Sequence, residues 1–193
     1  MNVDYIEFTK KIFAYKPDKT MNILHCVLGL IGEYFESCLE MTKYDKAQLA
    51  LMRYKATHTE YDSTLTELRV DIEKQEKAIQ KEFGDMMYYF HKLEEFLPFL
   101  ERAEDAQLME SASKMTLTFI IDQFLDQVKN RIFYNRDVEI EPIFFFLKVV
   151  EMIQHCGLNV NEIIEQNKEK LNKRYPEGFF SPEAAAAKAD ATT

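Results

Sequence analysis

Apolar residues recur at intervals of three and four positions along almost the whole chain, a spacing typical of amphipathic α-helices. The pattern predicts helices over residues 3–14, 20–41, 76–97, 105–130, 143–156 and 160–174. Residues 42–75 are polar with alternating charges, and we expect either an exposed helical hairpin or a partly mobile excursion there. The predicted fold class is all-α, a multi-helix bundle of about six or seven helices.

Residues that start or end helices give approximate boundaries for these elements. Thr20 or Asn22 is expected to cap the second helix, and Asn159 or Asn161 the last one. Helix ends are expected at Pro17, Pro98, Gly157 and Pro176. We expect one domain over residues 1–180 and a low-complexity tail over 181–193 that is frayed or forms a short exposed helix.

Glycine and proline are scarce, with 5 of each among 193 residues, about 5% in total against a usual share of roughly 12%. This composition disfavours turn-rich all-β folds and glycine-rich nucleotide loops. The 24 basic and 33 acidic residues give a net charge of −9, so the basic surface needed for nucleic-acid binding is not expected. Hydrophobic residues make up 47%, enough for a substantial core.

The three cysteines, Cys26, Cys38 and Cys156, form no Cys-x-x-Cys pair, and we interpret them as reduced, mostly buried thiols. Such cysteines are typical of a cytoplasmic protein. The first residues contain no apolar leader, and no stretch approaches the ~18 uncharged apolar residues of a membrane span. We therefore expect a cytoplasmic protein that is neither secreted nor associated with a membrane.

Two pairs of carboxylates interrupt apolar stretches of the predicted helices. Glu33 and Glu36 form a Glu-x-x-Glu pair, and Glu82 and Asp85 form a Glu-x-x-Asp pair. Side chains three residues apart share one helix face, and a carboxylate on a core-facing stripe needs a cation or another partner. Four such groups on two packed helices favour Mg²⁺ as the cofactor.

Gly29, Gly32 and Gly84 lie inside the same predicted helices, where each costs about 1 kcal/mol relative to Ala. We therefore expect close helix approaches at these positions. A single Glu-x-x-Glu is most often a pair of surface acids bound to lysine or arginine, but two pairs beside helical glycines favour a metal site. No histidine follows a glutamate by three positions, which excludes a ferritin-like site, and no His-Asp, His-Glu-x-x-His or Gly-x-Ser-x-Gly motif occurs.

Three segments resemble the MazG-type all-α nucleoside triphosphate pyrophosphohydrolases, in particular phage-style members. They are LHCVLGLIGEYFE (24–36), KEFGDMMYYF (81–90) and the closing NKEKLNKRYPEGF (167–179). The closing match is fairly specific, while the rest of the chain is similar only in its helical character. The resemblance implies a Mg²⁺-dependent enzyme that cleaves a (deoxy)nucleoside triphosphate into the monophosphate and pyrophosphate.

Carried over residue by residue, the resemblance implies that four carboxylates bind Mg²⁺: Glu33, Glu36, Glu82 and Asp85. It implies that Asn167 and Lys170 face the phosphates or sugar of the nucleotide. Glu36, with Glu33 beside it, is the expected catalytic carboxylate, because it can accept a proton from the attacking water. Arg174 is expected to be structural, since cations are favoured at a helix C-terminus.

The spacing departs from the family pattern, because 45 residues separate Glu36 from Glu82 where the family gap is short. An internal duplication is one explanation, since residues 30–37 align without gaps with 120–127. This alignment places Gln123 at Glu33 and Asp126 at Glu36. The hypothesis is a tandem pseudo-dimer with a degenerate second repeat over 105–180.

Recognition of the base is expected from aromatic side chains that could stack on it or bond it, with His25 and Tyr89 as the leading candidates and Phe8, Phe13 and Tyr88 as others. Aromatic residues at helical spacing are more often part of a core, and the Phe144–Phe146 run is expected to be core or an oligomer face. We expect a small-molecule nucleotide as substrate and a homo-oligomer, most simply a dimer. Two alternatives remain open: a catalytically idle helical binding or assembly protein, and hydrolysis of a non-nucleotide diphosphate.

Overall fold

The computed structural model describes residues 3–58 and 62–187, and this part of the chain consists of helices and the loops that join them, with no strand. The helices are α1 (Val3–Lys11), α2 (Lys19–Thr57), α3 (Ser63–Glu94), α4 (Ala106–Ser113), α5 (Leu117–Ile132), α6 (Ile143–His155), α7 (Val160–Arg174) and α8 (Pro182–Ala187), with a short 3-10 helix at Leu100–Arg102. The predicted all-α class is confirmed. Part of the expected tail is helical as α8, and residues 188–193 lie outside the described residues.

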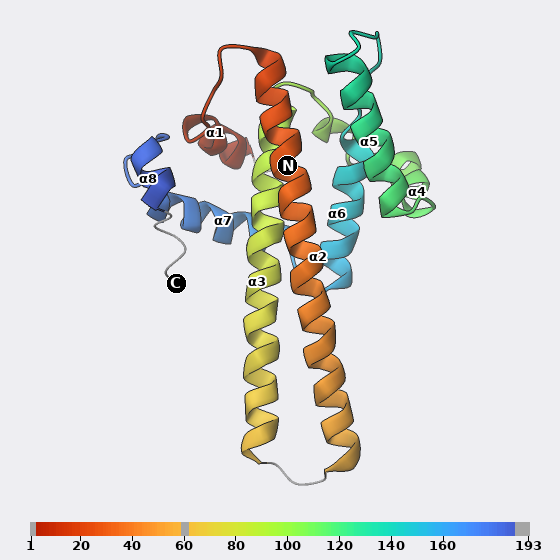
Figure 1. Cartoon of the computed structure of the whole chain (residues 1–193), viewed down its shortest axis with the longest axis vertical. Coiled ribbons are helices and arrows are strands. Elements are labelled where there is room, and N and C mark those ends of the chain that lie inside the picture. Colours follow the sequence, from red (N-terminus) through yellow and green to blue (C-terminus); the bar gives the residue numbers. More distant parts are fainter. Residues whose placement is uncertain (1–2, 59–61, 188–193) are drawn as a thin grey trace.

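A long antiparallel hairpin of α2 and α3 forms the axis of the molecule (Figure 1). Residues 42–57 and 63–75 continue these two helices without a break, so the expected hairpin is formed here, although residues 59–61 are outside the described part. We call residues 42–57 and 63–75 the distal half of the hairpin and the remainder its proximal half; the distal half extends beyond the other helices in Figure 1. Few apolar side chains are buried in this half, among them Ala47, Leu65 and Ile72. Its mostly polar sequence is consistent with this small buried surface.

The start of α2 differs from the sequence expectation. Asp18 caps the helix, and its carboxylate accepts a hydrogen bond from the Thr20 amide at 2.8 Å. Asn22 is buried instead and holds the preceding loop, because its side chain bonds both the amide and the carbonyl of Lys16. The prediction of a Thr20 or Asn22 cap is therefore wrong, because the cap lies two residues before Thr20 and four before Asn22.

Three further boundaries can be compared with the prediction. The helix expected over 105–130 is divided into α4 and α5, because Thr116 caps a new helix by accepting a hydrogen bond from the Phe119 amide. Asn159 caps α7 as expected, accepting from the Asn161 amide at 2.8 Å. The helix over 143–156 ends one residue early, before Gly157, whose positive φ of 72° suits a glycine.

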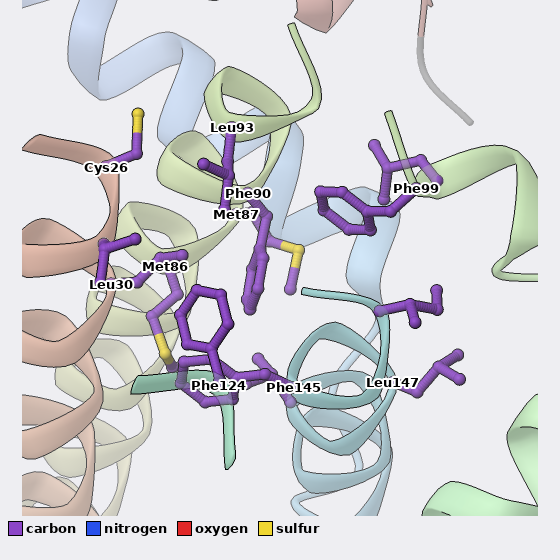
Figure 2. Packing of buried hydrophobic residues seen from close by; sticks show 14 of the residues in the cluster. Cys26, Leu30, Met86, Met87, Phe90, Leu93, Phe99, Phe124, Phe145 and Leu147 are labelled. Carbon is purple, nitrogen blue, oxygen red and sulfur yellow. The ribbon is translucent and has the colours of Figure 1, made fainter. Parts of the chain in front are cut away.

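The main core lies where the proximal half of the hairpin meets α5 and α6 (Figure 2). Phe145 of α6 is fully buried, with its ring centroid 5.4 Å from Phe90 of α3 and 5.9 Å from Phe124 of α5. Leu30 of α2 and Met86 of α3 pack into the same cluster. This confirms the core alternative for the phenylalanine run around Phe145.

Helix α7 runs across α3 rather than along it (Figure 1), and α1 contacts both helices. The crossing brings the closing sequence segment beside the Glu-x-x-Asp turn of α3. It is the feature of the fold that assembles the candidate site described below.

The proposed duplication stays a prediction. α5 and α6 contact each other as α2 and α3 do, but they contain 16 and 13 residues against 39 and 32. Gln123 and Asp126 are exposed on α5, and Asp126 forms an ion pair with Lys129 at 2.7 Å. Within the described ranges these positions join no carboxylate cluster.

All three cysteines are free thiols, with Cys26 buried and Cys38 and Cys156 half-buried. Among the described helices none is, by itself, both long and apolar enough for a membrane span. Only α6 and α7 joined across a bend of 99° reach that length and composition together.

The buried His91 makes the stability of the fold sensitive to acid. Its Nδ1 lies 2.7 Å from the Met87 carbonyl, its ring meets the edge of Tyr5, and burial lowers its pKa to about 4. In the unfolded chain a histidine titrates near 6.5, so unfolding takes up a proton below that pH and stability falls as the pH drops from 6.5 toward 4. We expect a loss of about 3 kcal/mol across this window, from the shift of roughly 2.5 pH units. Urea unfolding of the wild type and His91→Gln at pH 7.5 and 4.5 measures it; an equal loss in both proteins would contradict the assignment.

Candidate functional site

Three carboxylates from the two hairpin helices meet at one place. Glu33 and Glu36 lie one turn apart on α2, and Glu82 faces them from α3. One oxygen of each lies within 4.8 Å of the others, and the part of the chain that the structure describes holds no second group of this kind. The three sites differ in exposure, because Glu36 is exposed, Glu33 is half-buried and Glu82 is buried.

The negative charge of this cluster is only partly compensated. Oε1 of Glu82 accepts a hydrogen bond from Lys81 at 3.0 Å, whereas Oε2 is buried without a hydrogen-bond partner among the described residues. Burial, together with the charges of Asp85 and Glu82, raises the pKa of Glu33 to about 8. A divalent cation would relieve both the repulsion and the unpartnered oxygen, and oxygen-only ligands are those that Mg²⁺ prefers. The residues present therefore fit the expected metal.

Asp85 occupies a different position from the other three acids. It lies one turn after Glu82 on α3 and lines the same cavity, but it is not part of the three-carboxylate group. Its Oδ1 accepts hydrogen bonds from Nδ2 of Asn167, at 2.8 Å, and from Nζ of Lys170, both on α7. Asp85, the expected fourth metal ligand, is therefore hydrogen-bonded to α7 in this structure and stands apart from the other three carboxylates.

The helical glycines explain part of this arrangement. A Cβ at Gly84 would lie 3.0 Å from Asn167, so the missing side chain allows α7 to approach α3 beside Asp85. A Cβ at Gly29 would overlap the ring of Tyr89. Close approach is confirmed at these two positions, but the same expectation is wrong for Gly32 among the described residues, because nothing lies within 4 Å of its Cβ position.

A cavity of about 350 Å³ opens onto the carboxylates, a size within the range of small-molecule sites. His25 and Tyr89, the predicted base-recognition residues, both line it together with Tyr88. The His25 ring stacks on Phe13 at 4.9 Å, and its Nδ1 is buried without a partner among the described residues. Burial, with a smaller effect of Lys16, lowers the pKa of His25, so the imidazole is neutral at pH 7.

The predicted phosphate-binding pair is placed differently. Asn167 is 3% exposed and accepts a hydrogen bond from the Tyr5 hydroxyl at 2.6 Å while donating to Asp85. Neither Asn167 nor Lys170 lines the carboxylate cavity; both line a separate recess. In this structure both side chains donate a hydrogen bond to Asp85.

Two residues escaped the sequence prediction, and a third has a further place in the structure. Lys81 directly precedes Glu82 but could not be distinguished from the many surface lysines. Tyr5 carries no recognisable signal, because its partner is 162 positions away in the sequence. Arg174 was expected only to stabilise the end of its helix, and it also lines the cavity, which its position in the closing motif could have indicated.

In comparisons with known proteins, no protein-family model, no curated protein and no solved structure matches this chain.

The close approach at Gly84 gives a direct stability prediction. Gly84→Ala would gain about 1 kcal/mol of helix propensity, but overpacking a fixed neighbour costs roughly 1–3 kcal/mol. Asn167 cannot move without breaking its bonds to Tyr5 and Asp85, so we expect the overpacking to prevail. The free energy of unfolding in urea should fall by about 1 kcal/mol. An unchanged or higher value would show that α7 can move away freely.

Proposed function

We propose that the chain hydrolyses a (deoxy)nucleoside triphosphate to the monophosphate and pyrophosphate with Mg²⁺ as cofactor. The observation that carries the proposal is the meeting of three carboxylates within 4.8 Å, one with an unpartnered buried oxygen, at the wall of an aromatic-lined cavity. The similarity of the three sequence motifs to MazG-type pyrophosphohydrolases agrees with this proposal.

Glu33, Glu36 and Glu82 would hold the metal, and Asp85 would join them if Lys170 leaves it. Bound Mg²⁺ supplies positive charge for the polyphosphate and acidifies a coordinated water. The high pKa of Glu33 arises from burial and neighbouring negative charges, which a cation offsets.

The remaining roles belong to side chains around the cavity. Glu36 is the most exposed of the three acids and is the proposed acceptor of the water proton. Arg174 lines the cavity as a permanent cation for phosphate oxygens. The unpartnered Nδ1 of neutral His25 and the ring of Tyr89 would contact the base.

The two alternative functions, an idle binding or assembly protein and a non-nucleotide diphosphatase, would use the carboxylate cavity differently. An idle binding or assembly protein has no need for a buried carboxylate oxygen without a partner, since that oxygen lowers stability unless a cation binds. A non-nucleotide diphosphatase would keep the metal site and have no use for the aromatic wall. Both alternatives are outcomes of the experiment that follows.

The proposal is tested by incubating the protein with each dNTP and NTP plus Mg²⁺ and resolving pyrophosphate from orthophosphate. We expect pyrophosphate release from at least one nucleotide. Glu36→Gln should lower kcat by about 100-fold, because general-base catalysis contributes on that order. The matched control is Glu40→Gln, one turn along α2, where the carboxylate pairs with Lys43 outside the cavity and the change should leave kcat within about twofold. Turnover of no nucleotide, or equal effects of the two substitutions, would end the enzyme proposal.

We propose also that the protein forms a homodimer through α2. A stripe of apolar side chains on this helix is open to solvent: Met21, Leu28, Phe35 and Leu39. Leu28 and Phe35 are 70% and 64% exposed, and Gly32 lies between them with nothing near its Cβ position. Successive spacings of three, four and seven residues keep all five positions on one face of the helix.

Two features favour a second copy of the chain as the occupant. A helical glycine that no described neighbour requires is explained if another helix crosses there. Asp18 and Lys46 each lie 14 positions from Gly32, on opposite sides of it in the sequence, and close to the helix face of the stripe. If two copies of α2 cross symmetrically and antiparallel at Gly32, Asp18 of each copy would therefore lie opposite Lys46 of the other. The stripe adjoins Glu36, so the second copy would also shield the edge of the carboxylate cluster.

Sedimentation velocity over a range of protein concentrations tests the dimer. The double substitution Leu28→Glu/Leu39→Glu should raise the dimer dissociation constant at least tenfold, since charges would replace apolar contacts. Met52→Glu/Val70→Glu is the matched control, because these residues are exposed on the same hairpin but do not share the helix face of the stripe. A monomeric wild type, or equal weakening by the control, would contradict the proposal.

A further inference from the structure

A second cavity, which we call the lysine recess, is lined by residues of α3 and α7. Its volume is about 680 Å³, and four lysines line it: Lys77 and Lys81 from α3, Lys170 and Lys173 from α7. Amide side chains and the backbone turn at Gly84 complete the lining, and Glu169 is the one acid there.

The charge of the recess is opposite to that of the chain. The protein carries a net charge of −9, yet four lysines and one glutamate share this cavity. Lys81 and Lys170 are ion-paired with Glu82 and Asp85, whereas neither Lys77 nor Lys173 forms an ion pair among the described residues. Like charges gathered in one concavity repel each other and attract a compact multivalent anion.

We propose that the lysine recess binds a pyrophosphate group, either as free pyrophosphate or as part of a longer phosphate chain. Two linked phosphates present several negatively charged oxygens over a short length, which matches flexible ammonium groups arriving from two helices. Lys81 lines both the recess and the carboxylate cavity, so the two sites adjoin.

The two sites are also linked through their shared ion pairs. Lys81 and Lys170 now bind carboxylates that the proposed metal would bind, so a cation there releases both ammonium groups toward the recess. Metal and anion therefore strengthen each other's binding, and by thermodynamic linkage the effect is reciprocal. This linkage rests on the proposed metal site, whereas anion binding to the recess does not.

Calorimetric titration with sodium pyrophosphate in EDTA, using the whole chain, tests the recess without metal or turnover. We expect the wild type to bind and Lys77→Gln/Lys173→Gln to bind about tenfold more weakly, because each charged hydrogen bond contributes at that level. The control Lys74→Gln/Lys168→Gln removes the same charge from the same helices outside the recess and should stay within about twofold. No binding by the wild type, or equal weakening in the control, would overturn the proposal.

The linkage is measured by Mn²⁺ binding followed by electron paramagnetic resonance, with and without inorganic sulfate as a weakly chelating oxyanion. Sulfate should tighten Mn²⁺ binding in the wild type and much less in Lys77→Gln/Lys173→Gln. An unchanged Mn²⁺ affinity would refute the linkage. Pyrophosphate binding in EDTA without any nucleotide turnover would leave the recess standing and defeat the proposed enzyme, so the two failures are distinguishable.

Discussion

The concentration of carboxylates between α2 and α3 is the constraint to which the surrounding structure responds. Glu33, Glu36 and Glu82 bring three carboxyl groups to a partly buried place, and Asp85 adds a fourth close by. Without compensation such a cluster disfavours the folded state, and the high pKa of Glu33 reflects that cost. The protein supplies two ammonium groups, one beside Glu82 and one on α7, but one oxygen of Glu82 is left without a partner. The compensation is therefore incomplete in a way that suits a cation.

The crossing of α7 over α3 turns this local problem into a tertiary one. Gly84 lets the backbone of α3 come close to Asn167, which then joins Tyr5 of α1 to Asp85 of α3. The first helix, α1, is thus joined to α3 through the buried side-chain amide of Asn167 on α7. A second buried polar residue lies in the last turn of α3. The fully buried Lys92 is ion-paired with Glu95 and hydrogen-bonded to the Tyr15 hydroxyl, and these contacts fix the loop before α2. The loop carries Phe13 against His25, so this buried lysine supports the aromatic wall of the cavity.

Helical periodicity was sufficient to predict the all-α class and to predict that the two members of each acidic pair share one helix face, because both depend on spacing within single helices. It could not predict that α2 runs to Thr57, since a distal hairpin with few buried side chains has almost no amphipathic signal. It also could not distinguish Asp85 from its neighbours. That difference comes from α7, which lies 82 positions away from Asp85 at Asn167 and whose approach depends on a glycine. Contacts between distant segments decide these points, and no local pattern encodes them.

The net charge of −9 was taken as evidence against nucleic-acid binding, but for a small anion the distribution of charge matters more than its sum. On α3, Lys77 and Lys81 are four residues apart and share one face, while Glu82 and Asp85 occupy the neighbouring face. Neighbouring faces of α3 therefore line the acidic carboxylate cavity and the basic lysine recess. Helix α7 contributes to both in the same way, with Lys173 in the recess and Arg174 in the cavity. A ligand that carries both a metal ion and a chain of phosphates would satisfy both sides at once. An acidic protein can accept such a ligand because the opposing charges lie within one crossing of two helices.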